Sequence, residues 1–280
     1  MTISWRMFMI RRSLSVPKQL ETFRHILEQS AVEYMKITVL DEPPCLTNSR
    51  FGGLPYLPNG AVHPKNDAGE YMMLLAQINF SEAAFPIPFP QEGMLQIFLS
   101  PSPYQEGLEI NGCLPPNLFK VRYYPEVMAD DFITDFSYLR SASFPQHPII
   151  SQCPIDHELS LAFFREMEPI SATDYRLDRF IPMELSEQFT RSEQQPFDEI
   201  YLQHFSSAEH KIGGYPYFID ADPRAGEVSL QQYDTLLLQI VSNDEQGIMW
   251  GDSGVVKFFI PRKRLEKCDF SDILFYIEDY

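Results

Sequence analysis

The sequence predicts a strand-rich α+β protein made of two related β-rich halves in a pseudo-two-fold relation, with an N-terminal helix. Three motifs occur twice in the same order. The first copy has Gly52-Gly53-Leu54-Pro55-Tyr56, then residues 74–78, then 93–98, and the second has Gly213-Gly214-Tyr215-Pro216-Tyr217, then 237–240, then 254–259. Corresponding residues lie 161 or 162 positions apart, as Gly53 and Gly214 do. Three blocks at one spacing predict a duplicated structural unit.

The composition supports a folded protein rich in strands and loops. The chain has 280 residues, enough for a large buried core, and is 44% hydrophobic and 22% charged. Its 22 Phe and 14 Tyr argue against disorder. The 23 Pro outnumber the 13 Gly, which favours strands and loops because proline lacks the N–H donor that helix interiors require.

The first half is expected to contain one helix and four strands. The helix begins near Ser15, which can cap it, and Pro17, which fits its first turn. Its apolar face is expected to pack on a sheet and consists of Leu20, Phe23, Ile26, Leu27 and Ala31. Strands are predicted at residues 36–40, 72–78, 94–99 and 119–124, and proline-rich or polar loops at 85–90 and 101–116.

The second half is expected to combine helices and strands around the second repeat. A strand is predicted at 159–164, helical segments at 174–180 and 197–205, and a final strand at 273–277, the counterpart of 119–124. We therefore divide the chain into an extension, residues 1–15, and one domain, residues 16–280. Within this domain the repeats cover about 46–145 and 200–280, joined by a spacer at 146–199.

The charge balance restricts the classes of partner. The net charge is −17, from 39 acidic and 22 basic residues. Binding to nucleic acid or to an anionic membrane surface requires an excess of Lys and Arg, so neither is expected. A basic protein partner fits the charge, and plain solubility is the simpler explanation of the same acids. Nothing in the sequence indicates an oligomeric state.

The cysteines and the N-terminus indicate a cytoplasmic protein. Cys45, Cys113, Cys153 and Cys268 are widely spread and form no Cys-x-x-Cys pair, which fits a reducing compartment better than a disulfide or zinc scaffold. No apolar run approaches the ~20 residues that span a bilayer. The start of the chain lacks the order of a signal peptide, because its basic residues follow the apolar stretch.

No complete catalytic motif is found. Gly251-Asp252-Ser253-Gly254 matches the nucleophile segment of chymotrypsin-like proteases, but no His segment of that family precedes it. An aspartic-protease site would need a second Asp-Thr/Ser-Gly, and residues 234–236 lack the glycine. The six His include no His-Glu-x-x-His pair, and no phosphate-binding glycine loop occurs. We therefore expect no catalytic residue, cofactor or metal.

Six residues are the candidates for a cleft between the repeats. Gln77 and Gln239 interrupt apolar strands at the same repeat position, either to bind loop backbone within their own unit or to face a shared cleft. Asp222, Arg224, Trp250 and Asp252 lie where the two copies differ. Asp220 and Asp222 could supply oxygens to a divalent ion, but pairing of Asp222 with Arg224 is favoured.

Several of these segments together resemble the YwqG-like family, a group of largely bacterial proteins of unknown function. The matching segments are residues 51–58, which begin Phe51-Gly52-Gly53-Leu54-Pro55, and residues 75–80, 212–216, 236–240 and 249–254. The resemblance extends from about residue 17 to 280, so the first 15 residues look like an addition. It implies a strand-rich α+β cytoplasmic protein with internal duplication, and it supplies no activity or catalytic residue.

Taken together, these observations favour a non-enzymatic binding or interaction module with an acidic surface for a basic protein partner. The alternative is an enzyme or a small-molecule-binding protein that uses the cleft between the repeats. The two hypotheses differ in a structural requirement, because the alternative needs the six candidate residues to converge on one pocket.

Overall fold

The computed structural model describes residues 14–101, 112–141, 154–155, 157–193 and 195–279. Its strands are β1 (Val32–Leu40), β2 (Arg50–Phe51), β3 (Met73–Asn79), β4 (Met94–Leu99), β5 (Cys113–Leu114), β6 (Phe119–Tyr124), β7 (Leu159–Glu168), β8 (Lys211–Gly213), β9 (Thr235–Val241), β10 (Val255–Ile260) and β11 (Leu274–Glu278). Its helices are α1 (Arg24–Ser30), α3 (Ser137–Ser141), α4 (Leu177–Phe180), α5 (Met183–Glu193), α6 (Phe197–Phe205), α7 (Pro223–Gly226) and α8 (Arg262–Leu265). The predicted α+β class with a dominant sheet is confirmed.

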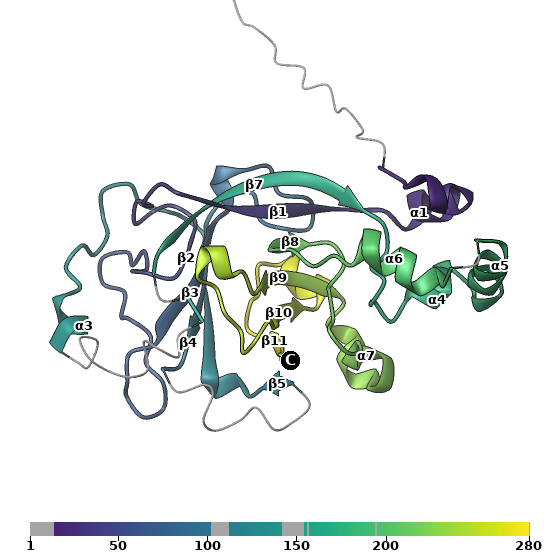
Figure 1. Cartoon of the computed structure of the whole chain (residues 1–280). Helices are drawn as coiled ribbons and strands as arrows, with labels where there is room; N and C mark the ends of the chain where they lie inside the picture. Colours follow the sequence, from purple (N-terminus) through teal and green to yellow (C-terminus); the bar gives the residue numbers. More distant parts are fainter. Residues whose placement is uncertain (1–13, 102–111, 142–153, 156, 194, 280) are drawn as a thin grey trace, which may run out of the picture.

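All strands join one antiparallel sheet in the order β5-β11-β10-β9-β8-β1-β7-β2-β3-β4-β6. The two longest strands, β1 and β7, pair along their full length at its centre, with Val32 opposite Glu168 and Leu40 opposite Ser160. On one side lie β2, β3, β4 and β6, which we call the first wing. On the other side lie β8, β9, β10 and β11, the second wing, with β5 at its outer edge. Figure 1 shows β1 and β7 passing above both wings.

The sheet curls into a half-barrel. Strands β5 and β6 stand at opposite ends of the strand order, yet only residues 115–118 separate them in the chain. Phe119 of β6 lies 5.5 Å from Phe275 of β11 between ring centroids, and Tyr123 lies 5.1 Å from Phe270. The main hydrophobic cluster combines side chains of both wings and of the central pair, so the core occupies the inside of the curl.

The N-terminal helix packs on other helices, and the expectation that it packs on the sheet is wrong. A 3-10 turn, Lys18–Phe23, leads into α1, and no side chain caps its start at Pro17. Leu20, Phe23 and Leu27 are buried in a second hydrophobic cluster with residues of α5 and α6. The rings of Phe23 and Phe197 lie 5.1 Å apart. The apolar face of α1 and the 3-10 turn before it is therefore buried by contact with other helices.

The other predicted elements fit the structure to different degrees. The strands at 119–124 and 273–277 correspond to β6 and β11, and the helix at 197–205 is α6. The strand at 159–164 extends to Glu168 as β7, and the segment 174–180 is helical only in α4. Helix α5 was not predicted. Residues 1–13, most of the loop at 101–116, and the spacer residues 146–153 with Cys153 lie outside the described residues.

In the described parts of the chain, no helix has both the length and the apolar character needed to cross a membrane.

Candidate functional site

Each wing carries a row of polar side chains on the face of the sheet opposite to the core. Residues paired across antiparallel strands point to the same face. The register of the first wing aligns a first polar row of Arg50, Gln77, Gln96 and Arg122. The register of the second wing aligns a second polar row of Lys211, Gln239, Lys257 and Tyr276. Of these residues, all but Arg122 are buried. The buried ones need internal partners, because an unpaired polar group is costly away from water.

Gln77 holds loop backbone of the first wing. Its Oε1 accepts the Tyr56 N–H at 2.7 Å, and its Nε2 donates to the carbonyls of Leu46 and Asn48, both at 2.8 Å. Its Oε1 also accepts from Gln96 Nε2 at 2.7 Å. The amide therefore joins two loops to the outer face of β3.

Gln239 makes the same set of bonds in the second wing. Its Oε1 accepts the Tyr217 N–H at 2.8 Å, and its Nε2 donates to the carbonyls of Ser207 and Glu209, both at 2.9 Å. Each bonded backbone group lies 161 residues after its counterpart at Gln77, as Tyr217 does after Tyr56. Both amides hold backbone within their own wing, as the first of the two interpretations has it.

Replacing either glutamine with leucine should destabilise the protein by about 2–3 kcal/mol, because buried backbone groups lose their partners. We expect this for both Gln77→Leu and Gln239→Leu, measured as the free energy of unfolding in urea. Gln232→Leu, at an exposed position, should stay within about 0.5 kcal/mol of the wild type. A change in the free energy of unfolding near zero for either Gln77→Leu or Gln239→Leu would contradict the role we assign to these amides.

Lys211, the first residue of β8, forms a buried ion pair with Glu168 at the end of β7. Its Nζ donates to both carboxylate oxygens at 2.8 Å, and Glu168 also accepts from the Tyr215 N–H and the Ser207 hydroxyl, each at 2.7 Å. Burial raises the pKa of Glu168, against the effect of Lys211. Gly214 has φ +74°, and a Cβ there would lie 2.0 Å from Glu168 Oε1, so this position requires glycine.

Lys257 of β10 is fully buried beside its register partner Gln239. Its Nζ donates to the Tyr217 carbonyl at 2.9 Å and to the Glu278 carboxylate. The rings of Phe218 and Tyr276 lie 4.2 and 5.0 Å from the ammonium group. Burial lowers the pKa of Lys257 to about 8, although Glu278 favours the charged form.

Asp222 and Arg224 form the third buried ion pair of this wing. Asp222 caps α7 by accepting the Arg224 N–H at 3.0 Å, and its two oxygens also accept Arg224 Nε at 2.9 Å and Nη2 at 2.7 Å. Arg224 Nη2 lies 3.5 Å from Asp174, which pairs with Arg176 at 2.6 Å. The charges of Asp222 and Arg224 act on Lys257. We call Asp174, Asp222, Arg224, Lys257 and Glu278 the buried charge cluster.

The six candidate residues occupy four different environments. Gln239, Asp222 and Arg224 lie around Lys257, whereas Gln77 lies in the other wing. Trp250 is fully buried in the main core, and its indole N–H has no hydrogen-bond partner among the described residues. Asp252 is exposed in the turn before β10. The structure thus brings three of the six residues together.

The chemistry of these groups is that of a stabilised scaffold. The carboxylates of the buried charge cluster are all bonded to cations. His210 is similarly engaged, since its two ring nitrogens lie 3.0 Å from Gln246 Oε1 and 3.2 Å from the Val241 N–H, and burial lowers its pKa. Within the described residues no group of three His, Cys, Asp or Glu side chains could hold a metal ion.

Five buried charged residues of the described structure are absent from the sequence-based candidates: Arg50, Lys211, Lys257, Glu168 and Asp174. For the two lysines the sequence does contain a signal. Lys257 interrupts the apolar run 255–260, and it lies 161 positions after Gln96. Lys211 lies 161 positions after Arg50. In both cases this is the spacing of the recurring sequence motifs, and the residues at both positions of each pair are buried.

Comparison with known proteins adds a family. A family model described as Domain of unknown function (DUF1963) matches residues 49–278, which include both wings and both polar rows. No curated protein matches the chain.

Proposed function

Because this match covers most of the chain, the protein belongs to the DUF1963 family, and we propose that it is a non-catalytic binding module with an acidic surface for a basic protein partner. The observation that carries the proposal is the contrast between buried and exposed charge. The buried acids around the second polar row are paired with cations. Many other acids are exposed, and the chain as a whole has a net charge of −17.

Three exposed aspartates mark a specific place for such a partner. Asp220, Asp252 and Asp279 are exposed and lie near the end of the β10–β11 pair. The Asp220 N–H donates to Glu278 at 3.4 Å, and the Asp279 carboxylate lies against Gly251, the residue before Asp252. Acids held on a rigid sheet end attract a basic surface and orient its approach.

The internal duplication and the more specific YwqG-like relationship are part of this proposal. Matched hydrogen bonds of Gln77 and Gln239 support duplication, and so do two further pairs of positions. In the first copy His63 lies 2.8 Å from the Met72 carbonyl and packs on Phe98. In the second copy the residues 161 positions later make the same two contacts: Arg224 donates to the Tyr233 carbonyl at 3.2 Å and packs on Phe259. We retain the repeat limits of about 46–145 and 200–280 and the cytoplasmic location, for which the free thiols of Cys45 and Cys268 are support.

The partner proposal predicts a charge-dependent capture. We expect Asp220→Asn/Asp252→Asn/Asp279→Asn to lose a basic protein that the wild type retains from cell extract at low salt and releases at moderate salt. The matched control replaces three other exposed aspartates, Asp41, Asp67 and Asp130, and should retain it. Equal capture by both triple variants, or no basic protein in any eluate, would refute the proposed site.

One observation favours the alternative of a small-molecule-binding protein or enzyme. The Trp250 indole N–H is buried on the inner side of the sheet without a partner in the described parts of the chain, and a polar ligand atom could accept it there. A thermal-shift screen of metabolites would distinguish the two functions, since a ligand of the folded state raises the melting temperature.

A further inference from the structure

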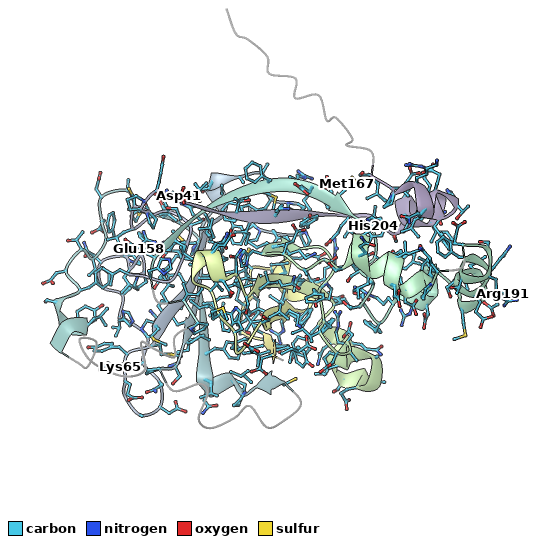
Figure 2. The ribbon with its side chains drawn as sticks, viewed as in Figure 1. Asp41, Lys65, Glu158, Met167, Arg191 and His204 are labelled. Atoms are coloured by element: carbon cyan, nitrogen blue, oxygen red, sulfur yellow. The ribbon has the colours of Figure 1, made fainter. Side chains whose placement is uncertain are left out.

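A group of cations lies beside β6 on the outer side of the first wing. Lys120 Nζ donates to the Lys65 carbonyl, and Arg122 Nη1 donates to the Val62 carbonyl at 2.5 Å. Both side chains therefore bind the loop 62–65, which carries the third cation. Lys65 Nζ lies 4.3 Å from the centre of the Tyr71 ring, and Figure 2 shows Lys65 at the lower left, on the side of β3 and β4.

These three cations have no acidic partner among the residues that the structure describes. Most other Lys and Arg of the described parts have a carboxylate oxygen within 4.0 Å, both on the surface, as in Arg165–Glu33, and inside, as in Lys211–Glu168. For Lys65, Lys120 and Arg122 no such pair exists within the described structure. In a chain of net charge −17, three adjoining unpaired cations are a marked local exception.

Lys120 and Arg122 keep N–H donors available for a ligand, and their bonds to the loop hold both side chains in place before it binds. The bond to Val62 uses one nitrogen of the Arg122 guanidinium, whose planar fork suits a two-point contact with an oxyanion. Lys120 and Arg122 are half-buried, so their charges are less screened than those of fully exposed lysines. Because both side chains are already held by carbonyls, binding costs little additional side-chain entropy.

A histidine and two tyrosines lie near these cations. Burial, and to a smaller extent the charge of Arg122, lowers the pKa of His63, whose nitrogens lie 2.8 Å from the Met72 carbonyl and 3.2 Å from the Tyr138 hydroxyl. The rings of Tyr71 and Tyr138 are half-buried and lie 5.1 Å apart. A ligand at the cations would therefore also contact a flat apolar surface.

The scaffold itself does not require these charges. In the second polar row, Tyr276 of β11 takes the place that Arg122 of β6 has in the first. Two residues earlier, β11 has Leu274 where β6 has Lys120. The outer strand of one wing thus forms the same pairing without the cations that the other carries.

We propose that Lys65, Lys120 and Arg122 form a binding site for an oxyanion, the phosphate or carboxylate group of a small molecule, with Tyr71 and Tyr138 beside it. The site lies in the first wing, and the acidic surface proposed for a basic protein lies at the end of the second. The two proposals are therefore independent.

Calorimetric titration of the whole protein with inorganic phosphate, pyrophosphate and citrate tests this site, and the two phosphates against citrate separate phosphate from carboxylate chemistry. We expect saturable binding of at least one of them to the wild type. Lys120→Gln/Arg122→Gln should weaken it by about tenfold or more, since charge-assisted hydrogen bonds are lost. The control, Lys263→Gln/Lys267→Gln, removes two other unpaired cations and should bind as the wild type does.

A second measurement separates a site from a general charge effect. The pKa of His63, followed by NMR, should rise towards its ordinary value when the anion binds, because the bound charge offsets Arg122. In Lys120→Gln/Arg122→Gln the anion should leave it unchanged, and unaltered melting temperatures should show that both variants are folded. Absence of saturable binding of all three anions, or equal affinities in the two double variants, would overturn the proposal.

Discussion

Replacing Arg224 with methionine is expected to destabilise the protein by about 3–5 kcal/mol, the usual cost of removing one partner from a buried ion pair. The guanidinium is 1% exposed, bonds both oxygens of Asp222, and donates to the Tyr233 carbonyl. Methionine would fill much of the same volume against Phe259 but leave the Asp222 charge buried and without its cation. The free energy of unfolding in urea measures this loss.

Two further variants identify the cause of that loss. Asp222→Asn combined with Arg224→Met should recover a substantial part of the stability, because asparagine keeps an oxygen for the N-cap of α7 and removes the unpaired charge. Arg165→Met breaks an exposed pair with Glu33 and should cost at most about 1 kcal/mol. If the double variant were no more stable than Arg224→Met alone, lost packing rather than buried charge would explain the effect.

The parts of the fold that the sequence predicts well are those with a strong local pattern. Strand β6 alternates apolar and cationic residues in its first four positions, β11 has a run of apolar residues, and α6 has buried side chains at helical spacing. Helix α5 is amphipathic but mostly polar, and Phe189 is its one buried residue among those described, so its few apolar residues do not stand out in the sequence. The central place of β7 depends on pairing with β1, from which more than a hundred residues separate it, and no local pattern encodes that pairing.

The candidate site was predictable where its residues belong to motifs that recur in the sequence. The glutamines stand out because Gln77 and Gln239 occupy matching positions of two such motifs. The Asp222–Arg224 pair is visible because its members are two residues apart. Asp174 lies 50 positions before Arg224, and Glu278 lies 21 positions after Lys257. These partners are brought into place by the curl of the sheet, which the linear sequence does not display.

Lys257 should give the protein an unusual dependence of stability on pH. Its pKa is about 8 in the folded protein, lowered by burial, and about 10.4 when the chain is unfolded. Between these values the unfolded chain binds more protons, so this group makes the free energy of unfolding increase as pH rises. We expect Lys257→Met to lack this increase. The difference in stability between wild type and variant should therefore grow from pH 8 to pH 10, by at least about 1 kcal/mol.

The comparison isolates Lys257, because tyrosines, cysteines and other lysines titrate in both proteins and cancel in the difference. Below pH 8 the variant should still be less stable by about 3–5 kcal/mol, since Glu278 remains buried without its cation. Lys257→Met/Glu278→Gln should recover most of this loss of stability. Its free energy of unfolding should also lack the increase between pH 8 and pH 10. A difference that shrinks between pH 8 and pH 10 would show that the ion pair with Glu278 outweighs burial and keeps Lys257 charged.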